Sequence, residues 1–114
     1  MATLYVRTVN LKDSLSDNEV VAYWKFLQEE FVPTALKVPG MRSIKLYSGA
    51  GALRADILAL FEMDDASVYE RVLVDPEVRK LLGRAYQPWD MKSATQIFCR
   101  EVTPELIQAL SGTG

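Results

Sequence analysis

Histidine is missing from all 114 residues of the chain. It is the commonest general base near neutral pH and the commonest metal ligand in proteins. Its absence excludes Ser-His-Asp and Cys-His catalysis within this chain. It also excludes a haem held by histidine and an iron site built from two histidines and a carboxylate. Any chemistry that the chain performs must therefore use other side chains.

Cysteine is scarce as well, because Cys99 is the single cysteine in the sequence. One cysteine cannot form an intramolecular disulfide, and it excludes a zinc site built on paired cysteines. A free cysteine is usually buried and behaves as a small apolar side chain. We therefore expect Cys99 in the core, and we expect neither a metal site nor a cofactor.

Long apolar runs and basic runs are also lacking. No window reaches the roughly 18 apolar residues of a membrane span, and residues 1–7 lack the pattern of a secretory leader. Thirteen Lys and Arg residues stand against fifteen Asp and Glu residues, a net charge of −2, with no basic cluster to neutralise phosphates. We expect a cytoplasmic protein that has neither a membrane nor a nucleic acid as its partner.

What the sequence does contain is the composition of one globular domain. Hydrophobic residues make up 49% of the chain and charged residues 25%, which is ordinary for a packed protein and far from disorder. A chain of this length divided into two cores would leave each half too small to be stable. We therefore assign residues 1–114 to a single domain.

The first half of the chain predicts a strand, a helix and a second strand. Apolar and polar residues alternate over residues 3–10. Ser16 and Glu19 fit a capping box, so a helix begins there, with an apolar stripe that includes Tyr23 and Trp24. Pro33 predicts that this helix ends or kinks near Phe31, and a short extension follows. A Val38-Pro39-Gly40 turn then leads into a strand over residues 41–47.

The second half repeats this order. Residues 48–52 are small and uncharged, which favours a hairpin connection; a phosphate loop is the weaker reading because no helix follows directly. Residues 53–63 are apolar on both faces, as in a covered strand. A helix is predicted from Ala66, broken at Asp75 and restarted by Pro76. Residues 87–90 predict a turn, residues 92–102 a fourth strand and residues 103–110 a terminal helix.

Two strand-helix-strand units in succession can pack together in a known way. They interlock as a four-stranded antiparallel sheet with two helices on one face, which is the ferredoxin-like βαββαβ sandwich of the α+β class.

The chain resembles the dimeric α/β-barrel superfamily in the order of its elements, in its length and in two sequence segments. These segments are Val38-Pro39-Gly40-Met41, and Glu62-Met63-Asp64-Asp65 followed by Ala66-Ser67-Val68-Tyr69. The resemblance implies a homodimer in which two sheets pack into a barrel, and a small-molecule pocket between sheet and helices. It brings to mind cofactor-independent monooxygenases of phenols and quinols, haem-degrading enzymes, cyclases, isomerases and stress-responsive proteins. Members that use a histidine do not fit this sequence.

The function predicted from these observations is the binding of a small apolar or aromatic molecule by a homodimer, as in a cofactor-independent monooxygenase. A non-catalytic ligand-binding or stress-related dimer is the alternative, and an isomerase or cyclase with Asp56 as its base is a third possibility. The candidate catalytic residues are Trp24, Asp56 and Arg7. The candidate substrate-binding residues are Tyr23, Asn10, Trp89 and Arg100.

These candidates also have structural interpretations. Tyr23 and Trp24 could be core residues, and Asn10 could serve the turn that follows its strand. Arg7 and Arg100 could form a positive spot for an oxygen anion if they share a sheet face, or Arg7 could pair with Asp56 or Glu62.

Overall fold

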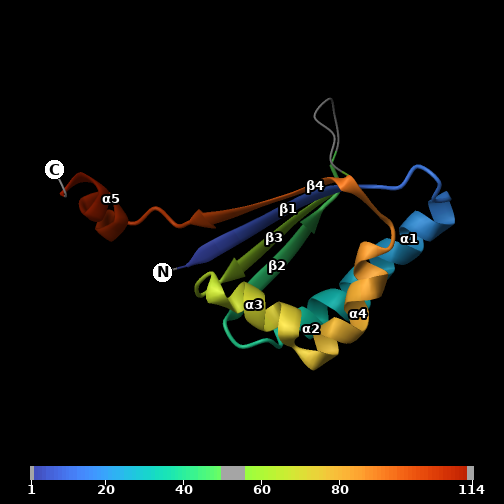
Figure 1. Ribbon diagram of the computed structural model, residues 1–114, viewed down its shortest axis with the longest axis horizontal. Helices are drawn as coiled ribbons and strands as arrows, with labels where there is room; N and C mark the ends of the chain where they lie inside the picture. Colours follow the sequence, from blue (N-terminus) through green and yellow to red (C-terminus); the bar gives the residue numbers. More distant parts are fainter. Residues whose placement is uncertain (1, 50–55, 113–114) are drawn as a thin grey trace.

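The computed structural model describes residues 2–49 and 56–112, which contain one four-stranded antiparallel sheet (Figure 1). The strands lie in the order β2-β3-β1-β4. Their bounds are Thr3–Leu11 for β1, Met41–Tyr47 for β2, Ile57–Met63 for β3 and Trp89–Arg100 for β4. This order is the ferredoxin-like arrangement, and it confirms the predicted fold class. Part of the predicted hairpin connection and the first residues of the predicted third strand lie outside the described residues.

The helices that build the second layer all lie on one face of the sheet (Figure 1). Ser16 caps the first of them as predicted, because its hydroxyl accepts from the Glu19 N–H at 3.2 Å and the Glu19 carboxylate accepts from the Ser16 N–H at 3.0 Å. The bounds are Asp17–Phe26 for α1, Leu27–Phe31 for the π-helical segment η1, Val32–Leu36 for α2, Ser67–Val74 for α3 and Pro76–Tyr86 for α4.

Of the two outcomes predicted at Pro33, an end or a kink of the first helix, the end near Phe31 is wrong. The helix continues without a break through η1 into α2, and the predicted extension is helical as far as Leu36. In the wider π turn the Val32 N–H donates to the Leu27 carbonyl. Widening just before Pro33 relieves the clash between the proline ring and the preceding turn. The Thr34 hydroxyl donates to the Glu30 carbonyl at 2.7 Å. This hydrogen bond gives a helix carbonyl a donor close to Pro33, which has no N–H of its own to donate.

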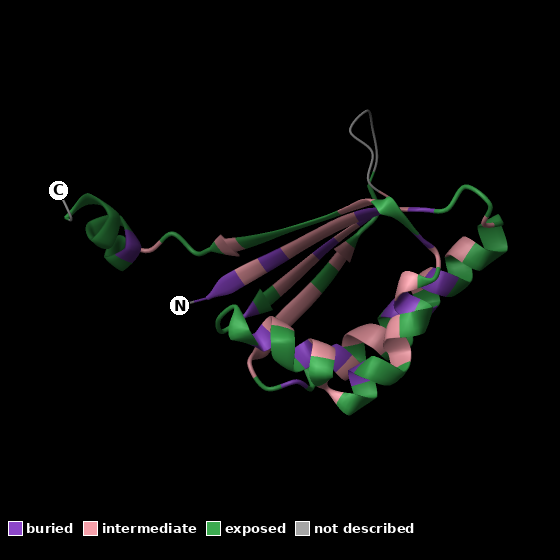
Figure 2. Ribbon diagram, viewed as in Figure 1, coloured by how far each residue is buried: buried purple, intermediate pink, exposed green. Residues whose placement is uncertain are grey.

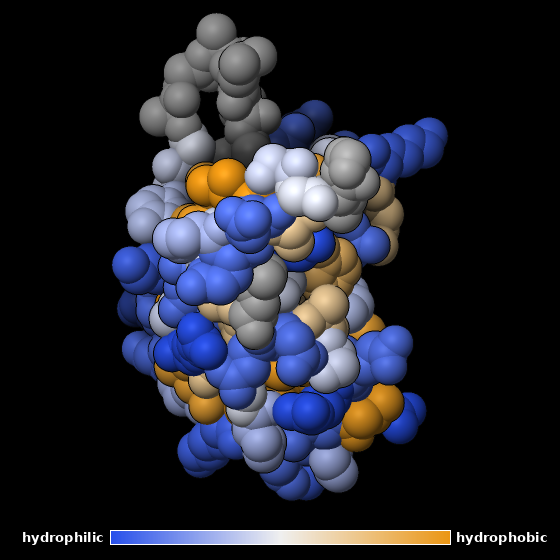
Figure 3. Space-filling view, turned by 90° about the vertical axis from the view of Figure 1, so that its left-hand side faces the viewer, coloured by the Kyte–Doolittle hydropathy of each residue, from blue (hydrophilic) through white to orange (hydrophobic). Residues whose placement is uncertain are grey.

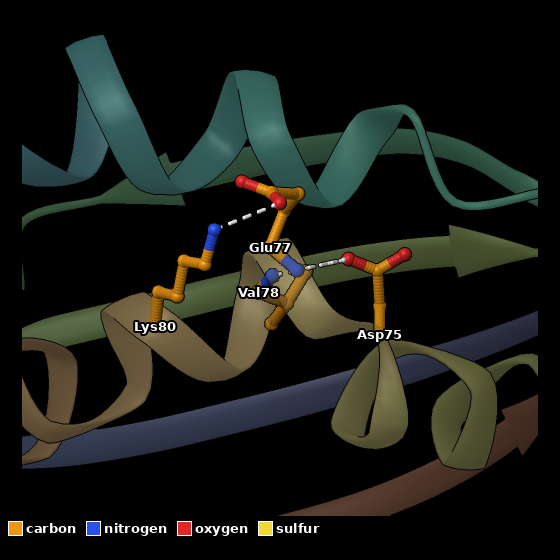
Figure 4. A network of polar contacts seen from close by, with 4 residues as sticks. All are labelled: Asp75, Glu77, Val78 and Lys80. Atoms are coloured by element: carbon orange, nitrogen blue, oxygen red, sulfur yellow. Dashed lines mark hydrogen bonds and ion pairs between the residues drawn. The ribbon is translucent and has the colours of Figure 1, made fainter.

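The predicted break between α3 and α4 is confirmed. Asp75 has an extended backbone, and its carboxylate accepts from the N–H groups of Glu77 at 3.0 Å and Val78 at 3.1 Å (Figure 4). Pro76 occupies the first position of α4, where a missing N–H costs nothing. Lys80 forms an ion pair with Glu77 one turn along. The Asp-Pro dipeptide therefore ends one helix and starts the next.

The turn between α2 and β2 depends on Gly40. Its φ of +94° lies in the region that favours glycine, and a Cβ built there would lie 2.6 Å from Cγ2 of Val68 on α3. The Gly40 carbonyl accepts from the Asp64 N–H at 2.9 Å, at the end of β3. Gly40 thus allows close approach of the turn to α3, as the sequence pattern indicates.

The core fills the space between the helices and one face of the sheet. On β1 the side chains of Tyr5, Val9 and Leu11 face the helices and are buried, and Ile57, Ala59, Phe61 and Met63 of β3 share that face. Helix residues complete the core from the other side: Tyr23, Phe26, Leu27, Ala35, Val68, Val72, Val78 and Ala85. Alternate burial along β1 and β3 is visible in Figure 2.

The opposite sheet face is apolar and has no helix over it (Figure 1). Val6 of β1 lies opposite Leu60 of β3 and Ile97 of β4, and Ile97 is 58% exposed. Among the described residues, the apolar side chains of this open sheet face include Leu4, Val6, Leu58, Leu60, Ile97 and Cys99, and Tyr47 of β2 lies opposite Leu58 on the same face. Cys99 is half-buried here, so its predicted place in the core of the chain is wrong.

The end of the chain differs from the rest of the fold. β4 begins at Trp89, which pairs with Leu11, so Trp89 and Asp90 belong to the strand and not to the predicted turn. β4 is exposed along most of its length (Figure 2). It leads into α5, Pro104–Ser111, which is confirmed as a helix but lies apart from both layers (Figure 1).

Viewed from the α5 end, apolar side chains reach the surface in several small patches separated by hydrophilic ones (Figure 3). Among the described residues, no helix has the length and apolar character needed to cross a membrane.

Candidate ligand-binding pocket

A pocket lies between the helix-covered sheet face and the helices. The cavity itself holds about 80 Å³, and its mouth is open to solvent. The sheet contributes Tyr5, Arg7, Met41, Ile44, Leu46, Ile57, Ala59, Phe61, Met63 and Trp89 to the wall, and the helices contribute Tyr23, Leu27, Phe31, Tyr69, Val72, Leu73, Leu82, Ala85 and Tyr86. This wall is largely apolar and aromatic, with a few polar atoms.

Arg7 is the one charged side chain among these lining residues. Its guanidinium donates to the Thr95 carbonyl at 3.3 Å and to Oε1 of Gln96 at 3.0 Å. It also lies 5.2 Å from the ring centre of Trp89 and 5.6 Å from that of Tyr5, which is the range of a cation–π contact. No carboxylate pairs with Arg7 among residues 2–49 and 56–112. The wall therefore carries a positive charge that its described neighbours hold in place but do not neutralise.

The Tyr23 hydroxyl joins α1, α4 and β4. It donates to the Ala85 carbonyl at 2.6 Å and accepts from Nε1 of Trp89 at 2.8 Å. A phenol has one proton to donate and an indole has one N–H, and both are used within the protein here. Tyr23 and Trp89 therefore offer a ligand their ring faces, while their donor groups hold the pocket together.

Three tyrosines of the pocket, Tyr5, Tyr23 and Tyr86, keep their protons at neutral pH. Burial raises the pKa of Tyr23 to about 12. Burial also raises the pKa of Tyr5, with the neighbouring Tyr69 hydroxyl as the second cause, and burial raises the pKa of Tyr86. The Tyr86 hydroxyl has no hydrogen-bond partner among the described residues, so it can act as a donor to a bound molecule.

Comparison with known proteins identifies the fold but no close relative. No known family's sequence pattern matches the chain, and no curated protein is significantly similar to it. Solved structures do match. A dimeric protein of unknown function with a ferredoxin-like fold, from Bacteroides fragilis, has a TM-score of 0.74 at 13% identity, over 88% of this chain and 96% of its own. A dimeric ferredoxin-like protein of unknown function from Thermobifida fusca has a TM-score of 0.71 at 14% identity, over 89% and 92% of the two chains.

A third match is SnoaB, a cofactor-independent oxygenase from Streptomyces nogalater. Its TM-score is 0.65 at 11% identity, over 90% of this chain and 97% of its own. This chain has the ferredoxin-like fold that these structures share. At such low identities the likeness establishes the fold and leaves function to be argued from the pocket.

Within this ferredoxin-like fold, three of the seven predicted site residues line the pocket. Arg7, Tyr23 and Trp89 come from β1, α1 and β4, so residues far apart in the sequence meet at one wall. The sequence did not predict that the hydrogen-bonding groups of Tyr23 and Trp89 would be used on one another.

The other four predicted site residues lie elsewhere. Trp24 is half-buried and packs against the core. Oδ2 of Asp56 accepts from the Leu11 N–H at 2.8 Å, and Oδ1 of Asn10 accepts from the Asp56 N–H at 3.1 Å. These bonds join the end of β1 to the start of β3. Arg100 shares a sheet face with Arg7 but lies opposite Thr3 at the far end of the strand pair, so the two arginines do not form one positive spot.

Several lining or neighbouring residues were not among the predicted site residues. Tyr5, Tyr69 and Tyr86 line the pocket together with Arg7, and Gln96 lies opposite Arg7 in the strand pairing. In the ferredoxin-like order β1 lies beside β4, so Gln96 could have been recognised as a partner of Arg7 only from the strand register. Among the described residues, no three acidic or cysteine side chains converge in a way that could hold a metal ion.

Proposed function

We propose that this protein is a homodimer that binds a small aromatic anion in the pocket between sheet and helices. The observation that carries the proposal is the half-buried Arg7 guanidinium, which faces an apolar pocket and has no carboxylate partner among the described residues. A cation beside apolar walls is best stabilised by an opposite charge with matching hydrogen-bond acceptors. A carboxylate or phenolate on a flat ring system supplies both the charge and the apolar surface.

Isothermal titration calorimetry with two probes of one shape tests this proposal. 2-Naphthoate carries a carboxylate, and 2-naphthamide replaces it by a neutral amide on the same ring. We expect the protein to bind the naphthoate more tightly. Hydrogen bonds to charged groups contribute about 1.5–3 kcal/mol, so Arg7→Gln should weaken naphthoate binding by roughly tenfold or more.

Arg79→Gln is the matched control for this experiment. Arg79 is exposed on α4 and does not line the pocket, so its replacement removes the same charge without touching the wall. Binding of the naphthoate by the control should be unchanged within about threefold. Equal affinity of the wild-type protein for the two probes, or binding of neither, would refute the anion site.

The homodimer is supported by the open sheet face. Its apolar residues include Ile97, which is 58% exposed in the single chain, and a sheet with two apolar faces requires cover on both. On α5, Ile107 and Leu110 are 56% and 67% exposed, which adds apolar surface that a second chain could cover. The two similar structures of unknown function are described as dimeric, in line with this assembly.

Sedimentation velocity at micromolar concentration tests the dimer. Ile97→Asp places a charge among the apolar side chains of the open sheet face and should yield monomers with an unchanged circular dichroism spectrum. Val21→Asp is the control, because Val21 is similarly exposed, at 52%, but lies on α1. That variant should remain dimeric. A monomeric wild-type protein would contradict the assembly.

A second candidate function is oxygenation of a bound phenol without a cofactor. The likeness to SnoaB, a cofactor-independent oxygenase, favours it. Arg7 would stabilise a phenolate, which can pass electrons to O₂. With 1-naphthol as the probe, one O₂ would yield 1,4-naphthoquinone and water. One oxygen atom enters the ring, the other leaves as water, and the ligand supplies all the electrons.

Oxygen uptake and product mass after incubation with ¹⁸O₂ test this second function. An oxygenase should consume one O₂ per quinone and place one ¹⁸O atom in the product, and Arg7→Gln should lower the rate. Tight binding without oxygen uptake would instead support the alternative of a ligand-binding dimer without catalysis.

A further inference from the structure

Gln96 lies directly opposite Arg7 in the pairing of β1 with β4, and the two side chains share the helix-covered face. Oε1 of Gln96 accepts two hydrogen bonds, one from Nη2 of Arg7 at 3.0 Å and one from the Tyr5 hydroxyl at 2.9 Å. An amide oxygen has two lone pairs, so both are used. Gln96 is not itself among the residues that line the pocket.

We propose that Gln96 is a positioning residue that sets the anion preference of the pocket, an inference that rests on the proposed anion site at Arg7. It holds the guanidinium with a neutral acceptor. A guanidinium held by a carboxylate would have most of its charge compensated within the protein. The amide fixes the same geometry and leaves the positive charge available to a ligand.

The contacts around Arg7 show why a fixed orientation matters. The guanidinium is held on one edge by Gln96 and the Thr95 carbonyl, and the rings of Tyr5 and Trp89 lie near it. Its remaining N–H groups can then meet a carboxylate or phenolate without first losing side-chain freedom. Gln96 also engages the Tyr5 hydroxyl proton, which leaves Arg7 as the main source of hydrogen bonds at this wall.

Replacement of Gln96 by Glu tests the inference, because it changes the charge and keeps the shape. The new carboxylate can accept the same two hydrogen bonds, so the fold and the place of Arg7 should be retained. The ligand anion would then lie about 6 Å from a like charge. At the effective dielectric of about 20 near a protein surface, this repulsion should weaken 2-naphthoate binding roughly a hundredfold, while 2-naphthamide binding stays unchanged.

Gln28→Glu is the matched control. Gln28 is exposed in η1 and outside the pocket lining, so this variant adds the same charge at the surface. Its ratio of naphthoate to naphthamide affinity should equal that of the wild-type protein. An unchanged ratio in Gln96→Glu, with a clear preference in the wild type, would overturn the role of Gln96 alone. No preference in the wild type would overturn the anion site and this inference together.

Discussion

Replacing Tyr23 by Phe removes one oxygen atom that serves two hydrogen bonds in the core. The side chains of Tyr23 and Trp89 are buried, and so is Ala85. Without the hydroxyl, Nε1 of Trp89 loses its acceptor and the Ala85 carbonyl loses a donor near the end of α4, where helix carbonyls lack partners from the helix itself. A buried group left without a partner costs about 1–3 kcal/mol. We therefore expect Tyr23→Phe to lower the free energy of unfolding by about 2–4 kcal/mol.

Urea unfolding followed by tryptophan fluorescence measures this change. The protein concentration must be the same for all variants, because dissociation of a dimer contributes to the measured free energy. Tyr86→Phe is the control, since the Tyr86 hydroxyl has no hydrogen-bond partner among the described residues, and its loss should change stability by less than about 0.5 kcal/mol. Equal stabilities of the two variants would refute the reasoning. The preference for 2-naphthoate should survive in Tyr23→Phe, because the Tyr23 hydroxyl does not serve the ligand.

Three further predictions concern stability alone. Burial raises the pKa of Tyr23 to about 12, so the unfolded chain ionises this tyrosine at lower pH than the folded protein does. Stability from this group is complete below about pH 10 and should be lost between about pH 10 and 12, by roughly 3 kcal/mol, a loss that Tyr23→Phe should reduce in alkaline urea titrations. Gly40→Ala should cost about 2–4 kcal/mol, from the positive φ and from the contact with Val68. Gly83→Ala, where nothing lies within 4 Å of the added Cβ, should instead stabilise the protein by about 0.5–1 kcal/mol in the same urea assay.

Features of the fold that depend on short stretches of sequence were predictable. The capping box at Ser16 and the helix restart at Asp75 each involve neighbouring residues and backbone groups, so the sequence pattern contains all the partners. The helix that continues past Pro33 was not predictable in this way. Its continuation depends on a π turn whose cost must be offset by packing of Leu27 and Ala35 against the sheet, and such packing is a tertiary effect.

The pocket was predictable only in part, for a similar reason. Arg7, Tyr23 and Trp89 were chosen by residue type, as side chains that can donate hydrogen bonds or supply an apolar wall, and all three line the pocket. Gln96 has no distinctive chemistry, and its importance follows only from its place opposite Arg7 in the strand register. Asp56 interrupted an apolar pattern as a catalytic base would, but its carboxylate accepts from the Leu11 N–H and joins strand ends.

The π-helical segment η1 also has a consequence for the size of the pocket. Both of its terminal residues, Leu27 and Phe31, line the wall. A π turn accommodates one residue more than an α turn, while the helices on either side keep their faces. Loss of a single residue inside η1 would therefore shorten the wall and leave Tyr23 and Ala35 directed at the sheet as before. A change of one residue in the length of this turn would therefore alter the size of the pocket, and with it the ligand that fits, while the surrounding core stays the same.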